Sequence, residues 1–573
     1  MGFLDYLVLF LYAAGMLFIG SLLSRRNKTS TDMFAVSKQS PWWLSGLSAF
    51  MSAFSAGTFV VWGGIAYQQG LVAVSICMCS GVSSFLVGRW LAGKWAGLGI
   101  TSVGEYLNLR FGPAVVQFYT WVGMLFKIVA MGVALYAFST LVCTIVTLPM
   151  GHILADDTGH LAKSYATVLS GLLMLVYAVS GGLWAVLIID AIQFVVLTVT
   201  VLFVIPLCFG QVGGVSGFLA AVPKGFLSPV SAQFSYLFLL GWIIVHTFKL
   251  GGEWVFIQRF LAVRSPADAR KSSYLFGTLY LVSPLLWMLP PMTYRLINPA
   301  ANPEQAYFLA CALVLPPGMI GLLLAAMFSS AASYIDGEVN VYAGAVTNDF
   351  YQLMLRPQAS EQELVLVGRI SSFAIGGIII GLALAVPYLG GAQKVILTLT
   401  SLLAVALVLP VLGGLFLRGI GQSAVWWSSA ASFAVALVVK LGLPAAATGP
   451  LRWYAAHAQV LEVYLGIAVP LLVVLLLHAL ARREHPGYGR VQALKYAQQE
   501  GRVTDAGSAI AAFPARMLAY SIAALGALLL LLAVQAGSRA PLVVTFGLVL
   551  VMTGSTLWWR LRRPQPVVTL VNN

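Results

Sequence analysis

Apolar runs long enough to cross a lipid bilayer recur from the first residues of this chain to near its C-terminus. About 20 apolar residues span the hydrocarbon core, and the backbone groups of a spanning segment must pair within a helix or a closed barrel. The runs lack the alternation of apolar and polar residues that marks barrel strands. Only 9% of the residues are charged, against roughly 25% in soluble domains. The sequence therefore predicts an all-α polytopic membrane protein with hardly any room for a soluble domain.

Fifteen spans fit the chain, with thirteen or fourteen as the alternatives because the runs at the two ends are the weakest. The predicted spans are 4–23, 43–66, 71–93, 114–145, 163–182, 184–209, 236–261, 272–295, 306–349, 367–388, 394–417, 424–441, 460–481, 516–534 and 542–561. The ninth is overlong, and we expect part of it to extend beyond the bilayer.

The basic residues between the spans predict an orientation. Arg25, Arg26 and Lys28 follow the first span, no basic residue precedes it, and loops rich in Lys and Arg face the cytoplasm. We therefore expect a multi-pass protein of the inner or plasma membrane with its N-terminus outside and its C-terminus in the cytoplasm. Alternation then places these residues on the cytoplasmic side: Arg259, Arg264, Arg270, Lys271, Arg418 and the loop 482–515.

Composition also limits the class of function. The net charge of +14 is accounted for by the cytoplasmic loops and does not predict nucleic-acid binding. The five cysteines have neither disulfide nor zinc spacing, and the histidines form no metal-binding group. No nucleophile motif occurs, which argues against a membrane enzyme, and the short loops leave no room for the output domain of a sensor. Transport is the function class that remains.

Small residues interrupt two spans at mid-length. Span 43–66 has small residues and glycines through its middle, and span 236–261 has Gly251 and Gly252 between Lys249 and Glu253. Broken backbone is tolerated in a membrane only where it faces a cavity or protein. Interrupted helices at matching positions of two halves indicate a transporter site. The alternative is that these glycines only let helices pack closely.

The two interrupted spans lie five spans apart, and because five is odd the second half would enter the membrane from the opposite side. The predicted domains are an N-terminal helix and cytoplasmic loop at 1–42, a first inverted repeat at 43–209, an extracellular loop at 210–235, a second repeat at 236–417 and extra C-terminal helices at 418–573. For the extra C-terminal helices, packing against the core and a dimer surface are the two roles that we consider.

A polar stripe runs along the ninth span. At 100° per residue, one helix face holds Ser329, Ser333, Asp336, Asn340 and Thr347. Ser330 is rotated by one residue from this face. An ionised group at the bilayer centre costs about 2.5–3.5 kcal/mol, so this face should meet water or a partner. Two adjacent hydroxyls beside the carbonyls of a broken helix would suit Na⁺. Serines that bond back to their own helix are the alternative, and Asp336 and Glu338 would face a vestibule or form an ion pair.

Four segments together resemble the solute:sodium symporter family. They are "IGSLLSRRNKTSTDMFAVSKQSPWWLSGLSAFMSAFSAGTF", "SGGLWAVLIIDAIQF", "WVFIQRFLAVRSPADARKSS" and "AAMFSSAASYIDGEVNVYAGAVTNDFYQ". They cover the first eleven spans, to about residue 418. The resemblance implies a LeuT-type core of two five-helix inverted repeats, one extra helix before it and about four after it. It also implies sodium-coupled import of a small organic solute by alternating access.

The resemblance implies a main sodium site as well. Its ligands would be the carbonyls of Met51, Phe54 and Ala326 and the hydroxyls of Ser329 and Ser330. A second sodium site of some members would use Asp190 with Ser329 and Ser333, but Ala332 lacks the hydroxyl that this site requires. Asp190 is then an acid for coupling or for structure, paired with a nearby hydroxyl or with Lys127.

The sequence indicates the solute only loosely. Sugar transporters of the family carry an Asn and a His where this chain has Ala53 and Thr58, which argues against a glucose-type pocket. Lys249 would suit a carboxylate-bearing metabolite, unless Lys249 and Glu253, at i and i+4, neutralise each other. The predicted lining of the substrate cavity is Phe54, Ser55, Thr58, Phe59, His246, Lys249 and Glu253.

Two alternatives stay open. A symporter of the same fold could be driven by protons through Asp190 or Asp336, and a sodium-coupled protein could carry a neutral solute such as a sugar or an amino acid. Neither the identity of the solute, nor the number of Na⁺ ions, nor the oligomeric state follows from the sequence.

Overall fold

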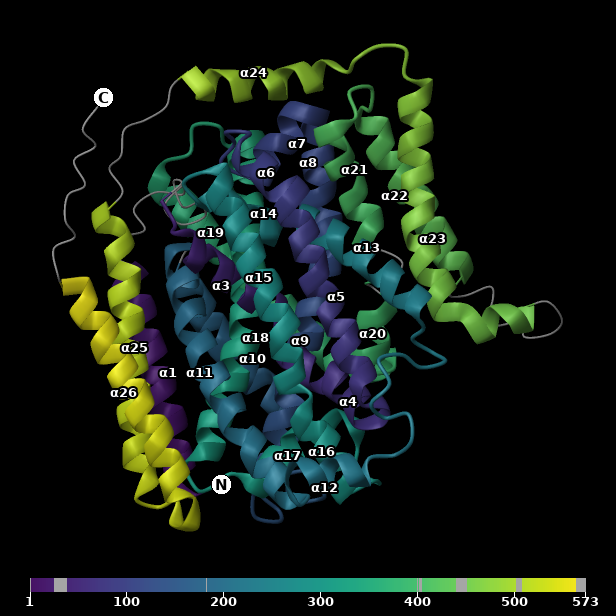
Figure 1. Cartoon of the computed structure of the whole chain (residues 1–573). Helices are drawn as coiled ribbons and strands as arrows, with labels where there is room; N and C mark the ends of the chain where they lie inside the picture. The colour runs from purple at the N-terminus through teal and green to yellow at the C-terminus, as the bar shows by residue number, and fades with distance from the viewer. Residues whose placement is uncertain are drawn as a thin grey trace, which may run out of the picture.

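A computed structural model describes residues 2–24, 39–181, 183–398, 400, 404–439, 451–500 and 508–562. Their regular elements are helices, and the β pairing among them is limited to isolated bridges. Figure 1 shows the long helices side by side in one bundle. The predicted basic segment Arg25, Arg26 and Lys28 lies outside the described residues. The all-α fold predicted from the sequence is confirmed.

The first predicted repeat corresponds to five long segments, several of them bent or joined from pieces. They are α3 (Trp42–Ala53) with η1 (Thr58–Trp62) and α4 (Gly63–Gln69), α5 (Leu71–Val87) with η2 (Gly88–Ala92) and α6 (Gly93–Ala96), α8 (Pro113–Phe118) with η3 (Tyr119–Gly123) and α9 (Met124–Ile145), α10 (Lys163–Gly181), and α11 (Leu183–Gln211). The short α7 (Val103–Phe111) connects the second of these to the third, and α12 (Gly214–Ala221) follows the last.

The second predicted repeat has the same number of long segments. They are α13 (Tyr236–Gly252) with α14 (Trp254–Ala262), α15 (Pro266–Trp287) with α16 (Leu289–Ile297), α18 (Met319–Gly344) with η5 (Ala345–Leu355), α19 (Glu361–Ala385) with η6 (Val386–Leu389), and α20 (Ala392–Thr398) with α21 (Ala404–Phe416). The connection before α18 contains η4 (Pro303–Gln305) and α17 (Ala306–Val314).

Additional helices flank this core. They are α1 (Phe3–Ser24), α22 (Gln422–Leu437), α23 (Leu451–Leu480), α24 (Pro486–Glu500), α25 (Ser508–Ala533), η10 (Gly537–Arg539) and α26 (Ala540–Arg562). In Figure 1, α25 and α26 lie on the side of α1, while α22 and α23 lie on the opposite side. Helix α24 runs across one end of the bundle, near α7, and α12, α16 and α17 lie at the other end.

The helices meet the length requirement of a membrane protein. Within the described ranges, nine are long and apolar enough to cross a bilayer, and the bent pair of Trp42–Ala53 and Thr58–Gln69 would make a tenth. Four shorter apolar helices are Phe3–Met16, Lys163–Val176, Tyr236–Gly252 and Ala404–Phe416. The chain is therefore a multi-pass membrane protein. Its orientation and its exact number of spans stay predictions.

The predicted ninth span, 306–349, is wrong as one span. Helix α17 ends at Val314, and α18 begins after Gly318, whose φ is +86°. Pro316 and Pro317 lie between them and have no amide hydrogens to continue a helix. The extra length that the sequence showed is therefore a separate short helix followed by a tight turn.

Asp5 fixes the start of α18 from a distant part of the sequence. Its Oδ1 accepts hydrogen bonds from the amides of Gly318 at 2.8 Å and Gly321 at 3.1 Å. The first amides of a helix have no partner within it, so this buried carboxylate satisfies two of them. Helix α1 is thereby attached to the helix that carries the predicted polar stripe.

Both predicted interruptions are present as short non-helical breaks, at Phe54 and Ser55 in the first and at Glu253 in the second. Helix α3 ends before Phe54, with φ −108° and ψ 128°, and α13 ends before Glu253, with φ −72° and ψ 138°. The first break bends the span by 59°.

The second break is at Glu253, directly after the glycine pair. Gly251 and Gly252 themselves still belong to helix α13. A Cβ at Gly251 would lie 2.3 Å from Leu91, and one at Gly252 would lie 2.1 Å from Val408. These glycines therefore bring α13 close to its neighbours, as the packing alternative proposed.

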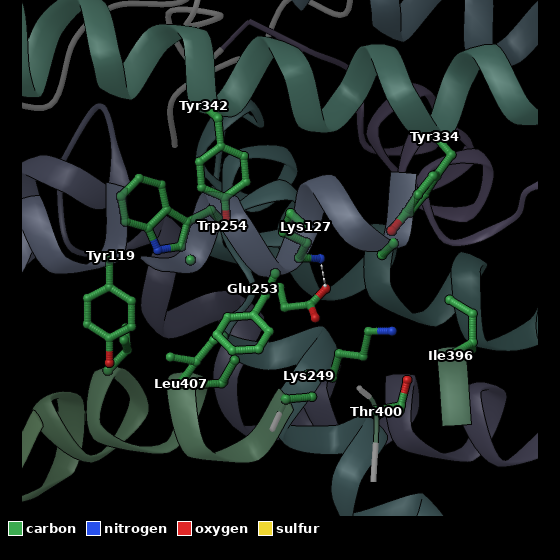
Figure 2. A pocket seen from close by; sticks show the side chains of 17 residues that line it. Tyr119, Lys127, Lys249, Glu253, Trp254, Tyr334, Tyr342, Ile396, Thr400 and Leu407 are labelled. Carbon is green, nitrogen blue, oxygen red and sulfur yellow. Dashed lines mark hydrogen bonds and ion pairs between the residues drawn. The ribbon is translucent and has the colours of Figure 1, made fainter. Parts of the chain in front are cut away.

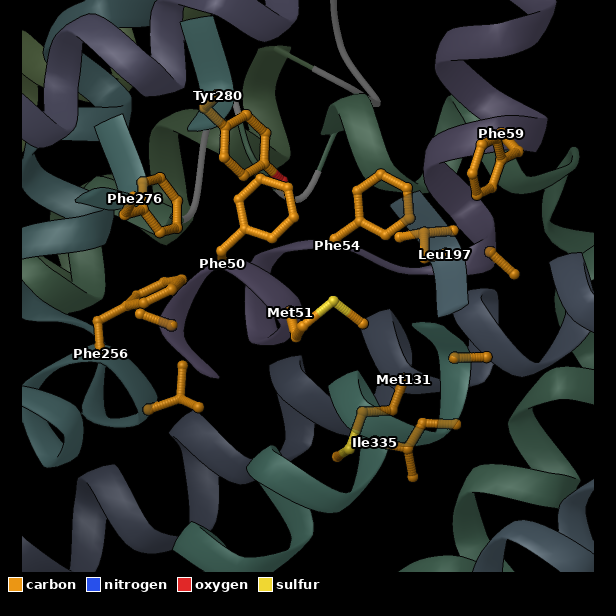
Figure 3. Packing of buried hydrophobic residues seen from close by; sticks show 14 of the residues in the cluster. Phe50, Met51, Phe54, Phe59, Met131, Leu197, Phe256, Phe276, Tyr280 and Ile335 are labelled. Carbon is orange, nitrogen blue, oxygen red and sulfur yellow. The ribbon is translucent and has the colours of Figure 1, made fainter. Parts of the chain in front are cut away.

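Aromatic residues fill the space beside the first break. Figure 3 shows Phe50, Phe54 and Tyr280 clustered above Met51. Phe54 lies 4.0 Å from Trp287 between ring centroids, and Phe59 lies 4.3 Å from Tyr307. The side chains of the broken segment are thus divided between this buried cluster and the cavity described next.

Candidate functional site

A cavity lies between the two breaks at the centre of the bundle. Its lining comes from α3, η1, α5, α9, α13, α14, α15, α18 and α20. A second cavity continues from it between α8–α9, α13–α14, α18 and α21, and each has a volume of about 130 Å³. The two share seven lining residues: Lys127, Ala130, Lys249, Glu253, Tyr334, Ile396 and Thr400.

Charged side chains occupy the junction of the two cavities. The Lys127 ammonium on α9 donates to Glu253 Oε2 and to Glu338 Oε1, both at 2.7 Å. Glu253 is the break residue itself, and Glu338 belongs to α18. An isolated charge in the bilayer interior is costly, and Lys127 offsets one of the two buried negative charges. The ion-pair alternative for Glu338 is thereby confirmed.

Lys249 stands beside this cluster without joining it. In the described part of the chain no hydrogen bond or ion pair holds its ammonium group, and Glu253 pairs with Lys127 instead. A direct ion pair between Lys249 and Glu253 is therefore not formed, although Glu253 is close enough to act electrostatically on Lys249. The Glu253 amide still donates to the Lys249 carbonyl at 2.9 Å, so the two residues keep their helical spacing, but the Glu253 carboxylate pairs with Lys127. Figure 2 shows Lys127 joined to Glu253 and the Lys249 side chain extending toward Ile396 and Thr400.

Most predicted substrate residues line the first cavity. Ser55, Thr58, His246, Lys249 and Glu253 all do so. Phe54 and Phe59 do not, because both are buried in the aromatic cluster. The imidazole Nδ1 of His246 lies 3.1 Å from the carbonyl of Trp242, one turn earlier in α13, and its ring packs on the indole of the same residue.

The predicted sodium ligands lie on two helices that pack against each other, α3 and α18. Ala326, Ser329 and Ser330 are fully buried. The Ser329 hydroxyl donates to the carbonyl of Ala325 at 2.6 Å, and the Ser330 hydroxyl donates to that of Met327 at 3.0 Å. Both serines thus bond back to their own helix, which leaves oxygen lone pairs directed elsewhere.

The extra helix α1 also reaches these serines, which the sequence reasoning missed. The Tyr12 hydroxyl forms a hydrogen bond with the Ser329 hydroxyl. Neither tyrosine of this apolar span carries a periodic signal, so only the packing of α1 on α18 could identify Tyr12.

Asp190 of α11 is bound by hydroxyls and not by Lys127. Its two carboxylate oxygens accept from Ser48 and Ser333, each at 2.5 Å. Ser48 and Ser52 in turn accept from the guanidinium of Arg259, at 3.3 Å and 2.8 Å. Asp190 therefore belongs to a network that joins α3, α11, α14 and α18.

Arg259, predicted to lie on the cytoplasmic side, is fully buried in α14. Its hydrogen bonds to the two serines make this burial tolerable. Tyr280, also missed, donates to the carbonyl of Ala53 at 3.0 Å, so one carbonyl beside the first break is already satisfied.

The family model of the sodium:solute symporter family matches residues 34–430, which include both broken helices and the whole cavity. The chain belongs to the sodium:solute symporter family. Members of this family are sodium-coupled transporters and not enzymes, so this chain is a membrane transport protein with Na⁺ as its coupling ion. Its LeuT-type fold, expected from the resemblance, is confirmed.

Relatives within the family carry different solutes. The sodium/glucose cotransporter of Vibrio parahaemolyticus is 26% identical over 460 residues, which cover 73% of this chain and 81% of the relative. The sodium/sialic acid symporter of Proteus mirabilis is 25% identical over 65% of this chain and 76% of the relative. The sodium/myo-inositol cotransporter 2 of Mus musculus is 27% identical, and the match spans 65% of this chain and 60% of the relative.

The fold of this symporter is similar to that of a solved Na⁺-coupled sialic acid symporter in a substrate-bound outward-open state. The TM-score is 0.68 at 21% identity, and the match covers 85% of this chain and 99% of the other.

Proposed function

We propose that this symporter imports a small organic solute that bears a carboxylate, together with Na⁺, by alternating access around the cavity between the two broken helices. The observation that carries the proposal is the Lys249 ammonium, which lines the cavity and has no ion-pair partner among the described residues. Lys127 is shared between Glu253 and Glu338, whereas no hydrogen bond or ion pair in the described ranges holds Lys249, which leaves its ammonium hydrogens available to a bound carboxylate.

The break beside Lys249 favours the same ligand chemistry. Helix α14 starts at Trp254, and the amides of Phe256 and Ile257 are already bonded to the Glu253 carbonyl. The positive end of a half-helix at mid-membrane attracts anionic substrate groups. A carboxylate between Lys249 and this helix end would gain a charge-assisted hydrogen bond and a favourable helix dipole.

For sodium, we propose the ligands implied by the family resemblance. The carbonyls of Met51 and Phe54 lie at the end of α3, and the carbonyl of Ala326 and the hydroxyls of Ser329 and Ser330 belong to α18, which packs on it. Hard cations such as Na⁺ prefer oxygen ligands of this kind. Asp190 and Ser333, hydrogen-bonded to each other, are proposed as a coupling element and not as a second complete ion site.

Uptake into proteoliposomes tests the proposal. The full-length protein is assayed with carboxylates, sugars and amino acids, with an inward Na⁺ gradient and with Na⁺ replaced by choline. We expect sodium-dependent uptake of a carboxylate and loss of its sodium stimulation in the double variant Ser329→Ala/Ser330→Ala. Sodium-dependent uptake of an uncharged sugar alone would overturn the carboxylate assignment and leave the sodium site standing.

Lys249→Gln tests the role of the free ammonium. A hydrogen bond to a charged group contributes about 1.5–3 kcal/mol, so we expect KM for the carboxylate to rise about 10- to 100-fold. Lys224→Gln is the matched control, because Lys224 is exposed in the loop before α13. An unchanged KM in Lys249→Gln would contradict the proposal.

Proton coupling is a second candidate, favoured by Asp336. This acid is buried in α18, and no hydrogen bond or ion pair to it is found within the described ranges, although Arg259 is close enough to act on it electrostatically. Uptake that persists in choline and follows an imposed pH gradient would favour this mechanism. The variant Asp336→Asn would then abolish the response to the pH gradient.

A further inference from the structure

A groove separate from the central cavities opens between the α5–α6 segment, α13, α21 and α23. Its volume is about 630 Å³. Trp90, Phe416 and Leu475 line it and are each about half exposed, which places the groove at the surface of the bundle. In a membrane protein, a surface groove along spanning helices is open to lipid.

One part of the groove is basic. Arg89, Lys94 and Arg270 line it and are exposed, and the structure gives none of them an ion-pair partner among the residues that it describes. The Lys94 ammonium lies 3.7 Å above the ring of Phe416. Lys495 of α24 is close enough to act electrostatically on Lys94. Several positive charges therefore converge on this part of the groove, and none of the carboxylates that the structure describes pairs with Arg89, Lys94 or Arg270.

The remaining wall is apolar. It comes from α21, the residue directly after it and α23, and consists of Leu409, Leu412, Leu417, Leu471, Val474 and Leu475. A ligand that matches both parts must carry an anionic group and a long apolar chain. Basic pockets between spanning helices on the cytoplasmic side are the places where anionic phospholipid headgroups bind.

We propose that an anionic phospholipid of the cytoplasmic leaflet binds in this groove, with its phosphate at Arg89, Lys94 and Arg270 and an acyl chain along α21 and α23. The leaflet follows from the predicted orientation, which puts the Arg270 end of α15 in the cytoplasm. A soluble phosphate compound would leave the apolar wall unused, and a zwitterionic lipid would leave the converging cations unneutralised.

The groove lies directly behind the central cavities. Thr247 and Phe248 line the groove and immediately precede Lys249 in α13. On α21, Leu409 and Leu412 face the groove, whereas Val408 and Val411 face the second cavity. A bound lipid would therefore contact the outer side of two helices whose inner side faces the transport path, and transport should depend on the lipid.

Native mass spectrometry of the full-length protein tests the site with equal amounts of phosphatidylglycerol and phosphatidylcholine. We expect the wild-type protein to retain phosphatidylglycerol preferentially and the variant Arg89→Gln/Lys94→Gln/Arg270→Gln to lose about tenfold in this preference. The control Lys271→Gln/Arg356→Gln/Arg369→Gln removes the same number of positive charges outside the groove. This control should keep the preference for phosphatidylglycerol. Equal retention by both triple variants, or equal loss in both, would overturn the proposal.

Photo-cross-linking of a lipid to the wild-type protein tests the site even if the triple variant does not fold. A photoreactive phosphatidylglycerol with its reactive group on the acyl chain is cross-linked to the wild-type protein, and the labelled peptides are mapped. We expect labels concentrated at 409–417 and 471–475, and Leu475→Trp, which fills the apolar part, should reduce them several-fold. Labels spread evenly over lipid-facing helices such as α19 and α26 would mean annular lipid only and would refute the site.

Discussion

At the level of single residues, the Tyr12 hydroxyl has a precise position beside a proposed sodium ligand. Ser329 donates its one proton to the Ala325 carbonyl, so in its hydrogen bond with Tyr12 the serine accepts and the tyrosine donates. One lone pair of the serine oxygen then remains for an ion. Tyr12 is thus a positioning residue that orients Ser329 without needing to touch the ion.

Tyr12→Phe removes only the hydroxyl. We expect the sodium concentration for half-maximal uptake to rise about 3- to 10-fold, because one hydrogen bond contributes about 0.5–1.5 kcal/mol. KM for the solute at saturating Na⁺ should stay unchanged, which separates this effect from general damage. Tyr6→Phe, on an exposed part of the same helix, is the control. An unchanged sodium dependence in Tyr12→Phe would mean that the bond only holds α1 in place.

The Lys127 cluster makes a prediction about stability. Lys127→Met would leave Glu253 and Glu338 as uncompensated buried acids, and breaking a buried ion pair costs about 3–5 kcal/mol. We expect a large fall in the melting temperature of the purified protein. Adding Glu338→Gln should restore part of it, because Lys249 then remains near Glu253. If adding Glu338→Gln to Lys127→Met lowers the melting temperature further, the three groups do not act as one cluster.

At the level of helices, close contacts at glycine hold the parts of the core together. A Cβ at Gly81 of α5 would lie 2.9 Å from the carbonyl oxygen of Gly277 in α15, and one at Gly277 would lie 3.0 Å from the carbonyl oxygen of Gly81. The two backbones therefore touch, which is the small-residue packing typical of membrane helices. Asp5 attaches α1 to α18 by a different means, a carboxylate on two helix-start amides.

Gly81→Val tests the first of these contacts. The obstructing atom is a backbone oxygen, which cannot rotate away, so we expect destabilisation by about 1–3 kcal/mol, seen as a lower melting temperature. Gly377→Val is the matched control on α19, where a Cβ would meet nothing within 4 Å. If both variants melt at the same temperature as the wild-type protein, α5 and α15 do not depend on this contact.

At the level of the whole molecule, the charges on the ion and the solute decide how strongly uptake can be driven. One Na⁺ that enters the cell gains about 2.3 kcal/mol from a membrane potential of about 100 mV. A tenfold concentration gradient contributes about 1.4 kcal/mol more. Together these would accumulate a neutral solute several-hundred-fold. A monoanion carried with one Na⁺ moves no net charge and keeps only the second contribution, about tenfold.

Solid-supported membrane electrophysiology measures this difference. If only the Ser329 and Ser330 site binds sodium and the solute is a monoanion, we expect uptake that is nearly independent of voltage and no sustained current at saturating substrate. A large inward current would refute the pairing of one sodium ion with a monoanion. It would require either a second ion or a neutral solute.

Much of the architecture could be predicted because lipid leaves the chain few choices. Buried backbone must be helical, so the apolar runs alone predict the spans, and the family segments predict the core. The sequence also indicated both broken helices and the cavity residues Ser55, Thr58, His246 and Lys249. It failed at 306–349, where two prolines and a glycine divide an apolar run into separate helices.

The sequence by itself determined which segments are apolar enough to be spanning helices and indicated that two of them are interrupted, because these features depend on local hydrophobicity and backbone freedom. Only the tertiary structure decided how the buried charges pair. Lys127 lies on α9, Glu253 at the break after α13 and Glu338 on α18, and no periodicity links residues so far apart. The same holds for Tyr12 with Ser329 and for Asp190 with Ser48. A buried polar group takes whatever partner the packing brings within reach, and that partner is a property of the assembled bundle.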